Sequence, residues 1–266
     1  TCTIGTSHTL LSGGYSVYLV AEDVAGNQLH QVLNMTIAID VNSPTQYIPY
    51  FNQTLSSGNS TLVSWQVSND AHSGVDYYIV NLSDIDRNET TTQVVNSTSL
   101  EFLDLLEGNY SACVKTVDNV GLQSANICTS QLLRIDSSVP SLSSSMNVTG
   151  WTNATSSVML IWNSSDTSSS TTMRYSLDSN AYSPSYPSNG SLVLSQLSNG
   201  WHTVRILVQD AAGNSIFSNH QFGIDRIAPV TNLSSLQAGG WTNMEQQLIT
   251  WSASDNLAGS GIILAQ

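Results

Sequence analysis

Alternating oxygen ligands lie between residues 84 and 89. Asp84 and Asp86 are followed by Asn88 and Glu89, so that side-chain oxygens recur at alternate positions, as in a calcium-binding loop. The segment lacks the glycine that such a loop uses for its sharp turn, and Asn88 also begins a glycosylation sequon. Asp84 and Asp86 are therefore candidate calcium ligands within an incomplete loop pattern.

Two further acidic candidates stand at a turn and at the end of a repeated segment. Asp210 precedes Ala-Ala-Gly-Asn, and Asp225 precedes Arg-Ile-Ala-Pro. At these places they could hold calcium between neighbouring repeats and stiffen the chain. Turn chemistry is the alternative, because Asp, Asn and Gly accept the backbone conformations that tight turns need. Beyond calcium, no cofactor is indicated.

Catalytic chemistry is not indicated by the remaining reactive side chains. The sequence contains no G-x-S-x-G, H-E-x-x-H, P-loop or G-x-G-x-x-G motif. No two of its histidines stand at metal-ligand spacing on one expected element; they are His8, His30, His72, His202 and His220. We therefore predict that the chain is not an enzyme.

The cysteines predict one disulfide. Cys113 and Cys128 are centred on the Val120–Gly121 turn, so a symmetric hairpin sets them opposite each other. Directly opposed strand positions have Cβ separations that suit a disulfide. Two reduced core cysteines are the alternative. Cys2 has no partner left in the chain, so it pairs elsewhere or stays free.

Twelve Asn-X-Ser/Thr sequons indicate N-linked glycans, because this composition would produce about six by chance. Such glycosylation places a protein at the cell surface or in the extracellular space. The acceptor positions are Asn34, Asn52, Asn59, Asn81, Asn88, Asn96, Asn109, Asn147, Asn153, Asn163, Asn189 and Asn232.

The charge pattern excludes two classes of partner. Six basic residues stand against 19 acidic ones, for a net charge of -13, and Lys115 is the only lysine. Nucleic acids and anionic membranes both require clustered cations, so neither is expected as a partner. No apolar run approaches the roughly 18 residues that span a bilayer, and no membrane span is expected.

One sequence segment occurs three times along the chain. Each copy is a strand-like stretch that ends in a turn aspartate, and these aspartates stand 95 and 92 residues apart. A tryptophan in an apolar stretch and a proline after a boundary aspartate keep nearly the same period. The landmarks are Asp23, Asp118 and Asp210; Trp65, Trp162 and Trp251; and Pro44, Pro140 and Pro229. A shared period over several landmarks indicates a tandem array.

Within each copy, alternation predicts a half-buried antiparallel strand before the turn. An aromatic with a leucine four residues before it opens this strand, as Tyr15, Tyr110 and Trp201, and we expect it in the core with the repeated tryptophan. The predicted buried faces are Val17, Leu19 and Ala21; Ala112, Val114 and Thr116; and Val204, Ile206 and Val208. Short strands with frequent turns and no helical periodicity predict an all-β chain of immunoglobulin-like sandwiches.

The phrases His202-TVRILVQDAAGN and Gly223-IDRIAPV resemble the Ig-like (Big-type) repeats of large bacterial and archaeal surface proteins. Residues 46–140 resemble a fibronectin type III unit about as well. The resemblance implies tandem sandwiches in an extracellular setting, where such domains mostly act as spacers or present other domains. The second copy departs from the phrase: it reads Asp118-NVGLQ where the others have Asp-x-Ala-Gly-Asn.

The period divides the chain into four parts. We expect the closing half of a domain at 1–45, complete domains at 46–140 and 141–229, and an opening half at 230–266. Each half is expected to be completed by further repeats of a longer chain or by another copy, with Leu248-ITW across from Tyr15-SVYLV. Joining the two halves leaves the tryptophan and corner aromatic 30 residues apart, against 45 and 39 in the complete domains, which favours the longer chain.

Two functions remain after these exclusions. The leading prediction is a glycosylated filament or cell-surface stalk, because tandem sandwiches with short Pro-containing linkers make a stiff rod. The alternative is an adhesin or carbohydrate-binding module that uses exposed aromatic side chains. The aromatic clusters available for it are Tyr47, Tyr50 and Phe51, or Tyr182 and Tyr186.

Overall fold

The computed structural model describes residues 9–153, 158–233 and 250–263. These residues form strands and loops only, which confirms the predicted all-β class. No helix suited to crossing a membrane occurs among them. The chain divides into two compact units, Thr1–Ser137 and Ser138–Gln266.

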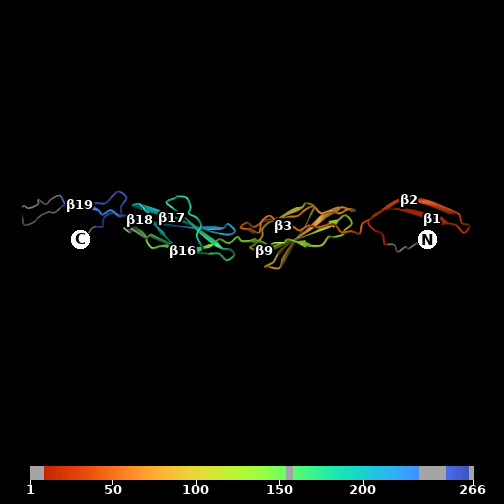
Figure 1. The fold of residues 1–266 in the computed structure, drawn as a ribbon, viewed down its shortest axis with the longest axis horizontal. Coiled ribbons are helices and arrows are strands. Elements are labelled where there is room, and N and C mark those ends of the chain that lie inside the picture. The colour runs from red at the N-terminus through yellow and green to blue at the C-terminus, as the bar shows by residue number, and fades with distance from the viewer. Residues whose placement is uncertain (1–8, 154–157, 234–249, 264–266) are drawn as a thin grey trace, which may run out of the picture. The chain divides into compact units, whose positions relative to one another are not determined.

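Unit 1 contains a long hairpin followed by a sandwich. The hairpin pairs β1 with β2 in antiparallel register and lies near the N-terminus (Figure 1). The strands of the unit are β1 Gly13–Glu22, β2 Gln28–Ile39, β3 Tyr50–Phe51, β4 Leu55–Ser56, β5 Thr61–Ser64, β6 Val75–Asp84, β7 Glu89–Val95, β8 Ser99–Phe102, β9 Gly108–Asp118, β10 Ile127–Cys128 and β11 Leu133–Ile135.

Two sheets make the sandwich of unit 1. One has the strand order β3-β5-β8, and the other has the order β4-β11-β9-β6-β7, with β10 also paired to β9. Their inner faces share one core around Trp65, in which Val63 and Phe102 of the first sheet meet Val80 and Val114 of the second. Because both sheets contribute alternate residues to one apolar layer, this is an immunoglobulin-like sandwich.

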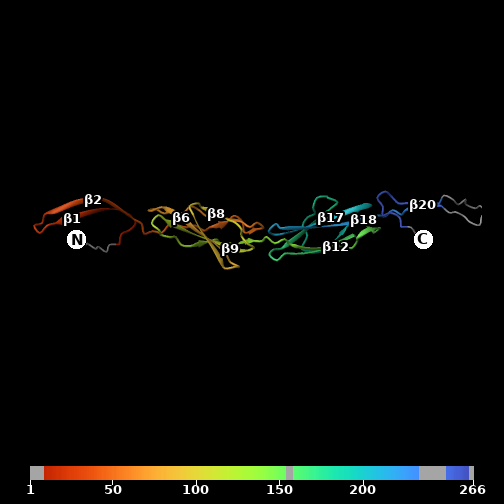
Figure 2. The same cartoon turned by 180° about the vertical axis from the view of Figure 1, so that it is seen from behind.

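Unit 2 repeats this arrangement and ends in a short hairpin. Its sandwich joins the sheets β12-β14-β16 and β13-β18-β17-β15 around Trp162, and Figure 2 shows β12, β17 and β18 within it. β19 pairs with β20 outside these sheets. The strands are β12 Ser141–Met146, β13 Gly150–Thr152, β14 Val158–Ser165, β15 Thr171–Leu177, β16 Asn189–Leu194, β17 Gly200–Asp210, β18 Ser215–Ile224, β19 Val230–Leu233 and β20 Trp251–Ser254.

The alternation predicted for the strand before the turn is confirmed in the second and third copies. All six side chains of those two faces are buried on β9 and β17. The first copy differs: Val17 is half-buried and Ala21 is exposed on β1, and the side chain of Leu19 lies outside the described residues. The reason is that β1 pairs only with β2 and has no second sheet against it.

The expectation that Trp201 is a core aromatic is wrong, because Trp201 is 60% exposed and contacts Trp151 with the two rings tilted by 55°. The residue in register with Tyr15 and Tyr110 is His202, eight positions before its turn aspartate in each copy. His202 is buried. Trp251, the last of the repeated tryptophans, is likewise not in a core; it is half exposed on β20.

Candidate functional site

The turn after the repeated strand is a closed hydrogen-bonded unit. At Asp210, Oδ1 accepts the N–H groups of Gly213 and Asn214, and Oδ2 accepts the Asn214 side-chain amide at 2.9 Å. Gly213 adopts a φ of 104°, which favours glycine. Asp23 makes the corresponding bonds to Asn27 in the first copy. The asparagine of the phrase therefore satisfies the second oxygen of the aspartate.

In the second copy this donor is missing. Asp118 Oδ1 accepts the N–H groups of Val120 and Leu122, as expected for the turn. Leu122 stands where the other copies have asparagine, so no side-chain amide reaches Oδ2. Asp118 is 1% exposed, and its Oδ2 is buried with no hydrogen-bond partner among the described residues.

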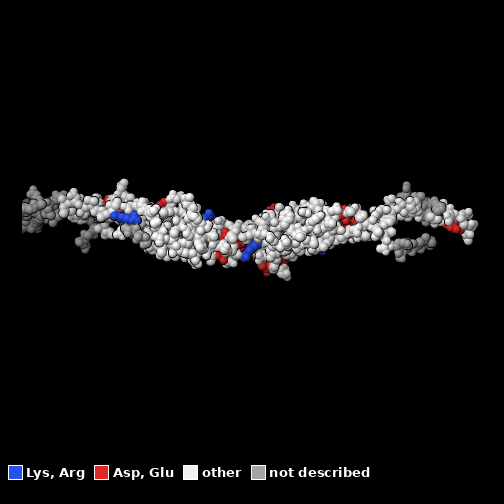
Figure 3. Space-filling view, in the orientation of Figure 1, with Lys and Arg blue, Asp and Glu red and all other residues white. Residues whose placement is uncertain are grey.

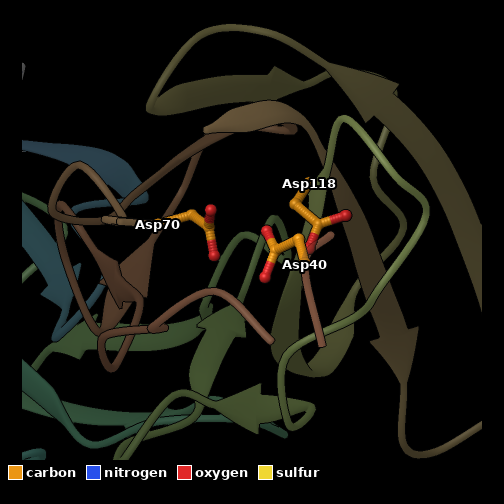
Figure 4. A group of neighbouring side chains, drawn as sticks. All are labelled: Asp40, Asp70 and Asp118. Carbon is orange, nitrogen blue, oxygen red and sulfur yellow. The ribbon is translucent and has the colours of Figure 1, made fainter. Parts of the chain in front are cut away.

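Two further carboxylates face this oxygen-rich turn. Asp40 follows β2, and Asp70 lies in the loop between β5 and β6. One carboxylate oxygen of each of Asp40, Asp70 and Asp118 lies within 4.8 Å of the others, and Figure 4 shows an oxygen of Asp118 directed toward Asp40. The cluster thus joins the end of the hairpin to two loops of the sandwich.

Backbone amides hold the other oxygens of the cluster. Asp70 Oδ1 accepts the N–H groups of His72, Ser73 and Gly74, and its Oδ2 accepts no hydrogen bond in the described chain. Asp40 Oδ2 accepts the Ser73 N–H at 3.0 Å. Hydrogen bonds from Ser73 and then from Asn42 lower the pKa of Asp40 from 3.8 to about 2, so this carboxylate is ionised at neutral pH.

Little positive charge lies beside these three carboxylates. The only ion pair that the three carboxylates make within the described residues is from His72 Nδ1 to Asp40 Oδ1, at 4.0 Å, and it exists only when the histidine is protonated. A cleft of about 250 Å³ opens beside Asp40 and His72. The geometry, with three carboxylates, little positive charge and access to solvent, suits a cation.

Sequence reasoning missed this cluster, although a signal for it exists. Asp70 has counterparts at Asp166 and Asp255, which follow it by 96 and 89 residues. The boundary aspartates Asp40, Asp136 and Asp225 show the same two spacings. Comparing the loop between the second and third strands of each copy would have found these residues.

The predicted calcium ligands at the first candidate loop are otherwise engaged. Asp84 Oδ2 pairs with Arg87 at 2.6 Å, and its Oδ1 accepts two backbone N–H groups. Asp86 accepts the Asn109 backbone and side-chain N–H groups. Burial raises the pKa of Asp84, but the hydrogen bonds and the positive charge of Arg87 oppose this effect, and the pKa lies below its usual value. The loop is a hairpin turn between β6 and β7.

The other two candidates are also held by the chain itself. Asp210 closes its own turn, as described above. Asp225 Oδ2 accepts the N–H and hydroxyl of Ser260, and its Oδ1 accepts the Ile227 N–H. The hydrogen bonds from Ser260 and Ile227 lower the pKa of Asp225. Both aspartates thus accept hydrogen bonds on both carboxylate oxygens, and calcium binding by either stays a prediction.

The two strand cysteines lie as their spacing predicts. Cys128 of β10 stands directly opposite Cys113 of β9, and a disulfide joins them. The closed loop has a sequence separation of 15 residues. Cys2 lies outside the described residues.

Most of the sequon asparagines that the structure describes are exposed. Nine are exposed, Asn81 and Asn109 are half-buried, and the side chain of Asn34 lies outside the described residues. Asn109 differs from the rest because its side-chain nitrogen donates to both oxygens of Asp86. A glycan at Asn109 would compete with that contact.

The predicted aromatic clusters divide between core and surface. Tyr186 packs against Trp162 and Tyr175 in the core of unit 2, and Phe51 packs against the core of unit 1. Tyr47, Tyr50 and Tyr182 are exposed. Tyr182 borders an open polar hollow of about 690 Å³, which is lined further by Asn180, Thr203, Arg205, Asn219 and Gln221.

Charge is sparse on the visible surface. Figure 3 shows Lys and Arg side chains standing apart on that face, with no basic patch.

The strand order and the two apolar cores define the class of protein: tandem immunoglobulin-like β-sandwich domains. No protein-family model and no curated protein matches the chain.

Solved structures with low sequence identity are similar. A tetra-tandem repeat in the extending region of a large adhesion protein is 15% identical, with a TM-score of 0.34; the match covers 86% of this chain and 61% of that one. Fibronectin(III)-like modules of Clostridium thermocellum CbhA are 10% identical, with a TM-score of 0.35 and coverage of 66% and 93%. The FN1–FN3 domains of chicken CNTN1 are 15% identical, with a TM-score of 0.38 and coverage of 78% and 75%.

Proposed function

We propose that the chain is a load-bearing segment of a glycosylated extracellular filament or cell-surface stalk. The observation that carries this proposal is the parallel pairing of an early strand, the second of each sandwich, with the last strand. In unit 1, β4 pairs in parallel with β11, and in unit 2, β13 pairs in parallel with β18. The chain therefore enters the early strand of this pair at one end and leaves the last strand at the opposite end.

Tension along the chain loads such a pair in shear. In unit 2 the pairing runs from Gly150 opposite Phe222 to Thr152 opposite Ile224, and the Asp225 N–H donates to the Thr152 carbonyl. Pulling on both ends stretches all of these hydrogen bonds together, whereas a hairpin pulled from its open end loses them one at a time. Two domains with this arrangement suit a spacer that must resist extension.

Glycosylation and location are parts of the same proposal. Exposed sequon asparagines and a surface with few charges fit a protein kept soluble by glycans, and the disulfide fits an oxidising compartment. We expect no enzymatic activity. The proposed partners are further repeats or copies of this chain, which would cover the exposed apolar side chains of the β1–β2 hairpin, such as Tyr18 and Leu29.

Electron microscopy of native material tests this function. The proposal expects elongated glycosylated filaments or cell-anchored stalks that shrink in mass after N-glycan release. Compact particles with no mass change would contradict it. Mapping the occupied sites adds a finer check, since Asn109 should carry less glycan than exposed Asn52 or Asn59 because its side-chain nitrogen is bound to Asp86.

Carbohydrate binding is the second candidate, favoured by the polar hollow on unit 2. Thr203 and Arg205 of β17 stand opposite Gln221 and Asn219 of β18, and Tyr182 adds an exposed ring. Amides, a guanidinium and an aromatic ring are groups that bind sugar hydroxyls and ring faces. A glycan array in which Tyr182→Ala and Gln221→Ala abolish a signal would support an adhesin; no signal for the unmodified chain would remove this candidate.

A further inference from the structure

An unsatisfied carboxylate oxygen remains at the junction between the β1–β2 hairpin and the sandwich of unit 1. Asp118 Oδ2 is buried without a hydrogen-bond partner, whereas Asp210 Oδ2 receives the Asn214 amide in the corresponding turn. A buried ionised oxygen without a donor costs free energy, so such groups in native proteins are normally satisfied. Leu122 stands where the other two turns have asparagine, so Asp118 Oδ2 requires a partner from outside the turn.

We propose that Asp40, Asp70 and Asp118 bind one calcium ion. Their facing oxygens lie within 4.8 Å of one another. Calcium binds oxygen at about 2.3–2.6 Å, so one ion reaches oxygens up to about 5 Å apart. Magnesium requires near-ideal octahedral geometry and loses its water reluctantly, so it is usually held by one or two carboxylates together with water. A group of three carboxylates therefore favours calcium over magnesium.

Two carboxylate oxygens of the cluster are available to bind an ion. Oδ2 of Asp118 and Oδ2 of Asp70 accept no hydrogen bond within the described chain, so both are available to an ion. Calcium takes six to eight oxygens, and water supplies those that the protein does not. The cleft beside Asp40 and His72 admits that water.

The bound ion would fasten one repeat to the next. Asp40 comes from the end of the hairpin, while Asp70 and Asp118 come from two loops of the following sandwich. The existing connection is small: Asp40 accepts the Ser73 N–H, and Thr45 exchanges hydrogen bonds with Asn69. This inference rests on the proposed spacer role. The calcium site can be disproved without disproving that role, because an array without calcium still resists extension through its parallel strand pairs.

Hydrogen exchange on the 1–266 chain, freed of metal with a chelator, tests the site locally. With calcium at about 10 mM, amides of residues 70–74 and 118–122 should exchange more slowly, and magnesium at the same concentration should have little effect. Asp118→Asn removes a charged ligand and should weaken calcium binding at least about tenfold. Unchanged exchange in calcium would overturn the proposal.

Leu122→Asn supplies the most specific test. It restores the amide that the other turns use, so Asp118 Oδ2 gains an internal donor as Asp210 has. We expect this variant to bind calcium more weakly than the original chain and to melt at a higher temperature without calcium. Asp86→Asn, in an acidic turn outside the cluster, is the matched control and should keep the original affinity. Equal affinity for the original chain, Leu122→Asn and Asp70→Asn would contradict the site even if Asp118→Asn failed to fold.

Discussion

At the start of β1, β9 and β17, one side chain makes a hydrogen bond to the backbone carbonyl four residues earlier. Tyr15 and Tyr110 each donate their hydroxyl to the carbonyl of the leucine four residues earlier, at 2.8 Å. In the third copy, His202 Nε2 lies 2.9 Å from the Ser198 carbonyl and keeps the four-residue spacing. Histidine thus takes the place of the corner tyrosine, with Asp178 bound to its other ring nitrogen.

Removal of one such bond should weaken its own sandwich. We expect Tyr110→Phe to lower the free energy of unfolding of the unit 1 sandwich by about 1 kcal/mol, the usual net value of one hydrogen bond. Hydrogen exchange of β9 amides under native conditions measures this loss. Tyr77→Phe is the control in the same sandwich, because the Tyr77 hydroxyl makes no described hydrogen bond; an equal loss in both variants would contradict the corner role.

We expect His220 to make unit 2 sensitive to acid. Desolvation by burial lowers the pKa of His220 below 6.5, so the folded state favours the neutral ring. The stability that depends on this neutral ring is fully present above pH 6.5 and is lost as the pH falls through 6.5 toward the lower folded pKa. We expect a smaller fall in melting temperature between pH 7.5 and 5 for His220→Gln than for the original chain. Identical falls would show that His220 does not carry the effect.

Among the strands, close packing of glycine against tryptophan fixes the register of unit 2. Gly190 of β16 stands opposite Trp162 of β14, and a Cβ at Gly190 would lie 2.7 Å from the indole ring. Trp162 is buried, and its Nε1 donates to the Pro187 carbonyl. The ring therefore has little freedom to move away.

Gly190→Ala should accordingly destabilise unit 2 by about 1–3 kcal/mol, the usual cost of overpacking. Urea unfolding followed by tryptophan fluorescence measures this change. Gly14→Ala is the control, since a Cβ at Gly14 meets no atom within 4 Å. A Gly190→Ala chain as stable as the control would show that the Trp162 contact is looser than described.

At this scale, strand alternation and turn residues were sufficient to predict much of the fold. The buried faces of β9 and β17, the opposed cysteines and the hairpin turns follow from local patterns of period two. The sequence analysis predicted Trp201 and not His202 as the core residue because it favoured the tryptophan for its size and aromatic character. The spacing of eight residues before Asp210 identifies His202 instead. The Asp40–Asp70–Asp118 cluster was missed because it joins three segments far apart in the sequence, and its decisive feature is a donor that Leu122 lacks.

Along the whole chain, the same domain arrangement occurs twice. Each unit contains a sandwich with its own core, and each sandwich pairs its early strand in parallel with its last. The aspartates, tryptophans and prolines that mark the repeat also mark the turns, cores and boundaries of these domains. Repetition of one domain with this strand pairing fits the proposed spacer under tension.

Single-molecule force extension of the 1–266 chain, held at both ends in chelator, tests this account most directly. We predict two separate unfolding events for the two sandwiches. Each should release about 30 nm when fully unfolded, or less where the Cys113–Cys128 disulfide keeps its loop closed. Trp151→Pro, which disrupts the parallel pair of β13 with β18, should lower the force of one event and leave the other unchanged. Smooth extension without discrete events, or a Trp151→Pro chain that unfolds at the original forces, would contradict the claim that these domains bear load through their parallel strands.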